Sequence, residues 1–155
     1  MSQDLVVAPL EESIWWIIPG KLAGMRKPNR EELQVLNAAG IGAIVSVMDD
    51  PSNLDWYEAA GIPHRWLPIK GGTAPTLEDA ETFRWFADEQ TARGHAVAVH
   101  CSSGRRRTGT LLGAYLILKG SSYDEAVAAV VRANPAVEMR EAQLTFLRSL
   151  ADSDL

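Results

Sequence analysis

Cysteine is almost absent from this sequence, because the 155 residues contain only one, Cys101. A single cysteine excludes an internal disulfide framework and a multi-cysteine zinc site, and it is compatible with a reducing compartment. No apolar run reaches the length of about 18 residues that a membrane-spanning helix needs. The first residues lack the basic and apolar regions of a secretory signal peptide, so we expect a cytoplasmic protein without a membrane span.

Positive charge is also scarce, with 15 Lys and Arg against 20 Asp and Glu and a formal net charge of −5. This balance argues against general binding to nucleic acid or to acidic membranes, so any anion site must be local. The three histidines show no metal-ligand spacing, and we expect no metal and no cofactor. The length predicts one domain over 1–155, with 1–12 as a flexible or loosely packed N-terminal segment.

Apolar strand patterns alternate with helical patterns along the chain. Strands are expected at 13–18, 41–48, 64–69 and 96–100, and helices at about 30–40, 52–60, 76–93, 107–120, 122–133 and 140–150. The runs IGAIVSVM and AVAVH are apolar almost throughout, which is typical of strands covered on both faces. The pattern predicts an α/β fold whose central, mostly parallel sheet has about four to five strands flanked by helices.

The stretch VHCSSGRRRTG, residues 99–109, links one of these strands to a helix. Cys101 lies at the carboxyl end of the strand, where ligands bind in parallel sheets. Backbone N–H groups of such a loop and the following helix N-terminus form an anion cradle, and Gly104 and Gly109 permit a tight backbone there. The same positive field favours a thiolate at Cys101, a nucleophile that can attack a bound phosphate.

The three consecutive arginines of this stretch are not equivalent. A guanidinium that turns back over the loop can bind two phosphate oxygens at once, and Arg107 is best placed for that role. Arg105 and Arg106 are expected to face solvent or a substrate.

The segment HCSSGRRRTG resembles the signature of the Cys-based protein tyrosine phosphatases: His-Cys, five residues, Arg, then Ser or Thr and Gly. Segments from SIWWIIPGKLAGM to HAVAVHCSSGRRRTGTLLGAYLI are similar to the small atypical dual-specificity phosphatases, over about residues 13–150. The resemblance implies the protein tyrosine phosphatase fold and hydrolysis of phosphomonoesters through a cysteinyl-phosphate intermediate. It implies phosphotyrosine as the substrate and, in a shallow pocket, phosphoserine and phosphothreonine as well.

The resemblance also implies a role for each matching residue. Cys101 would be the nucleophile, Arg107 would bind phosphate in the transition state, and Thr108 would stabilise the thiolate when it leaves. His100 and Gly109 would support the loop. The substrate-binding residues implied or expected here are Ser102, Ser103, Gly104, Arg105, Arg106 and, at the rim, Lys70.

One departure from the family pattern concerns the general acid. Such phosphatases carry an aspartate about 30 residues before the cysteine, but the corresponding stretch PIKGGTAP has Gly71 at that position. Asp49 or Asp50 is a candidate replacement, because both follow a neighbouring predicted strand. Glu138 is a second candidate, and the site can also lack a side-chain acid.

Asp79 is expected instead to cap the helix that begins at Thr76. Three functions therefore stay open: a phosphoprotein phosphatase, a hydrolase of inositol phosphates, pyrophosphates or other small polyphosphates, and a phosphate-binding module with weak turnover. The expected partner is a phosphorylated protein or a small phosphorylated molecule.

Overall fold

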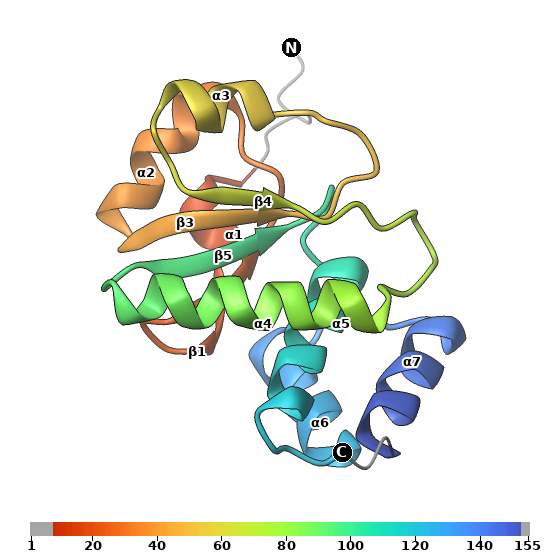
Figure 1. Cartoon of the computed structure of the whole chain (residues 1–155). Coiled ribbons are helices and arrows are strands. Elements are labelled where there is room, and N and C mark those ends of the chain that lie inside the picture. The colour runs from red at the N-terminus through yellow and green to blue at the C-terminus, as the bar shows by residue number, and fades with distance from the viewer. Residues whose placement is uncertain (1–7, 153–155) are drawn as a thin grey trace.

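The computed structural model describes residues 8–152 and is built on one five-stranded sheet (Figure 1). β2 pairs antiparallel with β1, and all other pairs are parallel. The fold is therefore the expected α/β arrangement with a mostly parallel central sheet. Across the sheet the order is β1 (Trp15–Ile18), β2 (Leu22–Met25), β5 (Ala96–His100), β3 (Ile41–Ser46), β4 (His64–Trp66).

Helices cover both faces of the sheet (Figure 1). One face is covered by α4 (Leu77–Ala92), α5 (Arg106–Leu118), α6 (Tyr123–Ala133) and α7 (Glu141–Asp152). The other face carries α1 (Leu10–Ser13), the turn η2 (Arg30–Glu32), α2 (Leu33–Ala38) and α3 (Leu54–Ala59). No helix in the described range is long and apolar enough to cross a bilayer.

The alternation of side chains along the central strands divides the core into two layers. In β5, Val97 and Val99 pack on the α5 side, whereas Ala96 and Ala98 pack on the α2 side. Every residue of β5 is buried, which is why its sequence reads as an uninterrupted apolar run.

Three helix starts predicted from the sequence have complete capping boxes. In each box the side chain of the capping residue accepts from a backbone N–H three residues later, and the acidic side chain there accepts from the capping residue's backbone N–H. Asp79 has this role, as expected. The pairs are Asn29 with Glu32, Thr76 with Asp79 and Ser122 with Glu125.

The sequence pattern missed strand β2, which contains Ala23 and Gly24, residue types that are uncommon in strands. The ring of Trp15 lies where a side chain at position 24 would begin, so the close packing of β1 on β2 requires glycine. Both β3 and β4 end before their predicted limits, at Ser46 and Trp66. Pro68 follows β4 and cannot donate a ladder hydrogen bond.

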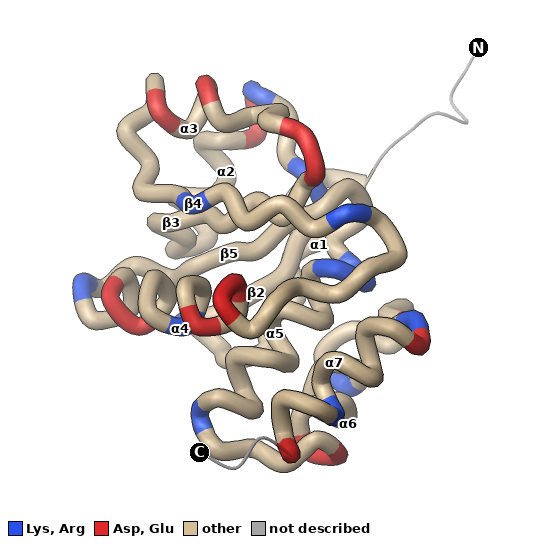
Figure 2. The backbone as a smooth tube through the Cα atoms, turned by 45° about the vertical axis from the view of Figure 1, so that its right-hand side comes forward, with Lys and Arg blue, Asp and Glu red and all other residues tan. Residues whose placement is uncertain are grey.

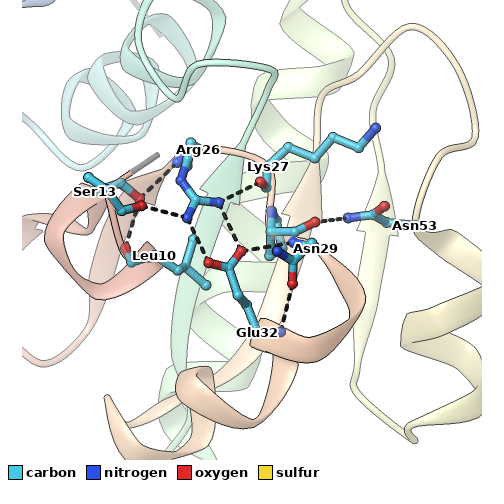
Figure 3. Close-up of polar contacts among 9 residues, drawn as sticks. Leu10, Ser13, Arg26, Lys27, Asn29, Glu32 and Asn53 are labelled. Atoms are coloured by element: carbon cyan, nitrogen blue, oxygen red, sulfur yellow. Dashed lines mark hydrogen bonds and ion pairs between the residues drawn. The ribbon is translucent and has the colours of Figure 1, made fainter. Parts of the chain in front are cut away.

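The N-terminal segment differs from its expectation at Leu10, which is fully buried against the α2 side of the sheet. Nearby, Arg26 forms a two-pronged ion pair with Glu32, with N–O distances of 2.9 and 2.7 Å, and donates to the carbonyl of Ala8 at 2.9 Å. Figure 3 shows Arg26 between Ser13 of α1, whose hydroxyl accepts from the backbone N–H of Arg26 at 3.3 Å, and Glu32, which accepts from the guanidinium. The expectation of loose packing over 1–12 is thus wrong at Leu10, and residues 1–7 lie outside the described range.

We predict that Leu10→Ala destabilises the protein by about 2–5 kcal/mol, since it deletes a fully buried side chain whose cavity cannot collapse completely. Urea unfolding of Leu10→Ala and of Glu12→Ala, a change at an exposed position of the same helix, provides the measurement and its control. Identical midpoints for the two variants would show that α1 does not contribute to the core.

Candidate active site

The loop from Cys101 to Arg105 connects β5 to α5 and rests on the backbone of its neighbours. Gly104 has φ +76°, and a side chain there would overlap the backbone of Met25 and Arg26. The indole of Trp15 donates to the carbonyl of Gly104 at 2.9 Å, and the backbone N–H of Lys27 donates to that of Ser102 at 3.2 Å. The β1–β2 hairpin therefore holds the loop in place.

The thiol of Cys101 is buried at the base of this loop and is 2% exposed. Burial by itself raises the pKa of the thiol, but hydrogen bonds outweigh that effect and the pKa lies below its ordinary value. The donors are the hydroxyl of Thr108, at 3.2 Å from Sγ, and the backbone N–H groups of Thr108, Arg105 and Gly104. These contacts stabilise a thiolate, and Thr108 contributes two of them.

A cavity of about 430 Å³ opens above the thiol. Arg107 reaches it from α5 and donates to the carbonyl of Ile69 at 2.9 Å, which fixes the guanidinium beside the loop. A more distant contact, 3.5 Å, joins Arg107 to the hydroxyl of Ser102. The residues lining the cavity are Gly71, Gly72, Cys101, Ser103, Arg106, Arg107 and Arg140.

Among the expected substrate-binding side chains, Ser103 and Arg106 line the cavity, whereas Arg105 and Lys70 do not. Arg105 contributes through its backbone N–H instead. Gly109 lets α5 approach α6 closely, because a side chain there would meet Val130 and Val137 at 3.2 and 3.1 Å.

His100 is fully buried and has two polar contacts. Its Nε2 lies 2.8 Å from the hydroxyl of Tyr57, and its Nδ1 lies 3.4 Å from the carbonyl of Cys101. Burial lowers the pKa of His100 to about 4, so the ring is neutral at pH 7. Asn53 completes the chain by donating to Tyr57 at 3.0 Å and to the carbonyl of Pro28 at 2.8 Å, the latter drawn in Figure 3.

The two aspartates considered as general acids are exposed and do not line the cavity. Asp50 accepts from both the hydroxyl and the backbone N–H of Ser52, and it faces a separate hollow that also contains Lys27. The Ser52 bonds, with the charges of Lys27 and Arg107, lower the pKa of Asp50. A general acid at neutral pH needs a raised pKa, so this environment disfavours Asp50 in that role.

Glu138 is exposed, and its contact with the site is through its carbonyl, which accepts from Nε of Arg106 at 2.9 Å. Gly71 itself faces the cavity, and a side chain built there would meet nothing within 4 Å. Within residues 8–152 no carboxylate lines the cavity, and no group of three potential metal-ligating side chains occurs.

Several residues of the site lie outside the signature and were missed by the sequence analysis. Arg140, before α7, lines the cavity, and Gln143 is fully buried beneath it. Trp15 belongs to the core, as its strand pattern indicates, but it also binds the loop. Neither spacing nor composition marks these residues, because each reaches the site only through the folded arrangement of distant elements.

The site consists of a buried strand, a tight loop with a stabilised thiolate, and a helix that carries Arg107 in its first turn. This arrangement is that of a Cys-based phosphatase site. The family model described as "PTP-SAK: Swiss Army Knife protein, DSP-PTPase phosphatase domain" matches residues 11–154, and the chain belongs to this family. The tyrosine and dual-specificity class inferred from the signature is thereby confirmed.

Curated relatives agree with this assignment. The tyrosine-protein phosphatase cdcA of Emericella nidulans is 29% identical over 81% of this chain and 22% of its own length. The tyrosine-protein phosphatase CDC14 of Saccharomyces cerevisiae is 30% identical over 71% of this chain and 20% of its own. This chain thus spans about a fifth of the length of these fungal relatives.

Solved structures share the fold. Tk-PTP in the active form is 30% identical, with a TM-score of 0.83 over 92% of this chain and 98% of that one. PTPMT1 in complex with PI(5)P has a TM-score of 0.80 over 90% of this chain and 95% of that one, and at 21% identity it supports the fold alone.

We predict that Thr108→Val raises the pKa of Cys101, because it removes the hydroxyl that donates to Sγ. The thiolate fraction below that pKa falls roughly tenfold or more, as expected for loss of a hydrogen bond to a charged group. The rate of alkylation by iodoacetamide as a function of pH measures this change. Thr110→Val is the matched control, since the hydroxyl of Thr110 donates to the carbonyl of Arg106; an equal shift in both variants would contradict the assignment.

Proposed function

We propose that the protein hydrolyses phosphomonoesters through a cysteinyl-phosphate intermediate on Cys101. The observation that carries this proposal is the thiol with a lowered pKa at the base of a cavity lined by Arg107. The thiolate attacks phosphorus, the S–P bond forms, and the bond from phosphorus to the ester oxygen breaks. Arg107 and the loop amides bind the three remaining oxygens, whose charge grows in the transition state.

In the second step water attacks phosphorus and loses a proton to the solvent, and the S–P bond breaks. The sulfur leaves as a thiolate, and the hydroxyl of Thr108 stabilises it through the contact present in the free protein. His100 acts indirectly, because its neutral ring holds the carbonyl of Cys101 and thereby the backbone of the nucleophile.

The first step proceeds without a carboxylic acid, on this proposal. Gly71 stands where the family resemblance places the aspartate, and the other carboxylates named above do not line the cavity. A positioned general acid accelerates such steps by roughly 10²–10⁴-fold. The expected substrates are therefore those whose leaving oxygen needs little protonation, a group that contains both aryl phosphates, including phosphotyrosine, and phosphoanhydrides.

A second candidate substrate group is the small, highly charged phosphate compound. The specific observation in its favour is the accumulation of arginines around the cavity without a carboxylate. The relatives named phosphatidylglycerophosphatase and protein-tyrosine phosphatase 1, such as the mouse protein at 32% identity over 61% of this chain, combine lipid and protein substrates in their name. The third possibility is a phosphate-binding module with slow turnover. The next experiment distinguishes such a module from an enzyme.

Cys101→Ser is expected to lower kcat for p-nitrophenyl phosphate by roughly 10³-fold or more, since the hydroxyl is a far weaker nucleophile than the thiolate. Rapid quenching of the wild type at pH 5–6 is expected to trap one phosphoryl group per chain, seen by mass spectrometry of the peptide that contains Cys101. Equal rates in both proteins would reject the mechanism. Phosphate binding without measurable turnover in the wild type would identify a binding module.

Gly71→Asp is expected to restore acid catalysis, because the cavity has open space at that position. The variant should gain roughly tenfold or more in kcat/KM for alkyl phosphates over Gly71→Asn, the control of equal size. The gain for p-nitrophenyl phosphate, whose leaving group needs no proton, should be much smaller. Because neighbouring arginines lower the pKa of a carboxyl, the gain should increase toward acidic pH. Equal gains for both substrates would show that leaving-group protonation is not what the native site lacks.

A further inference from the structure

Two guanidinium groups beside the catalytic loop have no evident counter-charge. Arg106 and Arg140 line the same cavity as Cys101 and Arg107, and both are exposed. The described residues place no carboxylate within 4 Å of either one, whereas some arginines elsewhere in the protein, such as Arg26 and Arg93, form ion pairs. In a chain with net charge −5, three arginines around one cavity that no carboxylate of the described residues lines are a local concentration of positive charge.

Hydrogen bonds hold the side chain of Arg106 and the backbone of Arg140 in place. Nε of Arg106 donates to the carbonyl of Glu138 at 2.9 Å, which orients the side chain, and its two terminal nitrogens have no hydrogen-bond partner among residues 8–152. The backbone N–H of Arg140 donates to the side chain of Gln143 at 2.8 Å, and the amide of Gln143 donates to the carbonyl of Thr73 at 3.1 Å. Gln143 is fully buried, so it ties the start of α7 to the loop that contains Gly71.

The basic positions come from separate parts of the chain. Figure 2 shows basic segments at the start of α5 and just before α7 on the same side of the molecule, and the cavity lining joins them. Three like charges at one cavity repel one another, and a single phosphate on Cys101 and Arg107 satisfies the donors of the loop and of one arginine. The cavity volume of about 430 Å³ is typical of a site for a small molecule larger than one phosphate group.

We propose that Arg106 and Arg140 form a second anion subsite beside the catalytic phosphate site, and that the substrate carries a second phosphate group close to the scissile one. This inference rests on the proposed function for the identity of the first site. Two kinds of compound share the required chemistry: a phosphoanhydride, and a molecule with two phosphomonoesters on neighbouring carbons. In the anhydride the leaving group is itself a phosphate, which needs little protonation and so suits a cavity without a carboxylic acid.

Binding of non-hydrolysable ligands by calorimetry tests the subsite independently of turnover. The probes are inorganic phosphate, methylene bisphosphonate, and decane-1,10-diyl bisphosphonate, whose second phosphonate is too distant for the subsite. Arg140→Gln is expected to weaken binding of methylene bisphosphonate roughly tenfold or more, as for a lost charge-assisted hydrogen bond, and to weaken the other two probes much less. Arg132→Gln, at an exposed position on α6, is the control for the loss of one positive charge.

Equal weakening of the short and long bisphosphonates would overturn the proposal, since it would show a general effect of charge. Equal affinity of the wild type for both compounds would overturn it as well. If Arg140→Gln fails to fold, as judged by circular dichroism, Arg106→Gln takes its place with the same comparison. None of these ligands reacts, so binding and turnover are tested separately. If the protein has no activity but binds the short bisphosphonate more tightly than the long one, the proposed hydrolysis is wrong and the subsite is supported.

Phosphate release then distinguishes the two sources of the second phosphate. Pyrophosphate and ethane-1,2-diyl bisphosphate are compared with phenyl phosphate as substrates of the wild type. If pyrophosphate has the highest kcat/KM of the three, the substrate is an anhydride. If ethane-1,2-diyl bisphosphate has the highest kcat/KM, the substrate carries two phosphomonoesters on neighbouring carbons. A preference for phenyl phosphate over both would contradict the inferred substrate class.

Discussion

The close contact of Gly104 with the backbone of Met25 and Arg26 is the constraint on which the site depends. No side chain fits between the two segments, so the loop lies directly on the end of β2. In that position the N–H groups of Gly104 and Arg105, together with that of Thr108 in the first turn of α5, donate to the sulfur of Cys101. Packing of backbone on backbone thus orients these donors before any ligand binds. The loop therefore stabilises the thiolate without having to reorganise when phosphate binds.

A buried polar chain also supports this loop, through His100 at the end of β5. His100, Tyr57 and Asn53 lie where an unpaired polar atom would cost about 1–3 kcal/mol, and each finds a partner in the next. The neutral histidine holds the carbonyl of Cys101, which leaves the N–H groups of the loop to face the sulfur. Asn53 is the one non-glycine residue in the described range with positive φ, +72°, and its amide reaches both Tyr57 and Pro28. This strained position is maintained because the α3 start and the β2 turn are both bound through it.

The sequence predicted local features of the site better than long-range ones. Cys101, Arg107 and Thr108 belong to one continuous segment, and a strand-loop-helix pattern is sufficient to bring them together. The capping boxes are equally local, since three residues suffice to form each one. β2 was missed because it contains Gly24, which is needed to make room for the ring of Trp15. This contact has no signature in the sequence. Leu10 and Arg140 were missed for the same reason. Leu10 enters the core, and Arg140 lines the cavity, only through contact with elements that are distant in the sequence.

The glycine at position 71 affects the site in two ways. An aspartate there would supply a proton donor, but it would also place a negative charge in the cavity that Arg106, Arg107 and Arg140 line. At a few ångströms, and at the effective dielectric near a protein surface, each such pair interacts by several kcal/mol before desolvation is counted. The arginines would then be partly neutralised, and they would lower the pKa of the carboxyl, so that it donates a proton mainly at acidic pH. With glycine the cavity loses acid catalysis but keeps its full positive charge, and this favours ligands whose leaving group is both anionic and easily expelled.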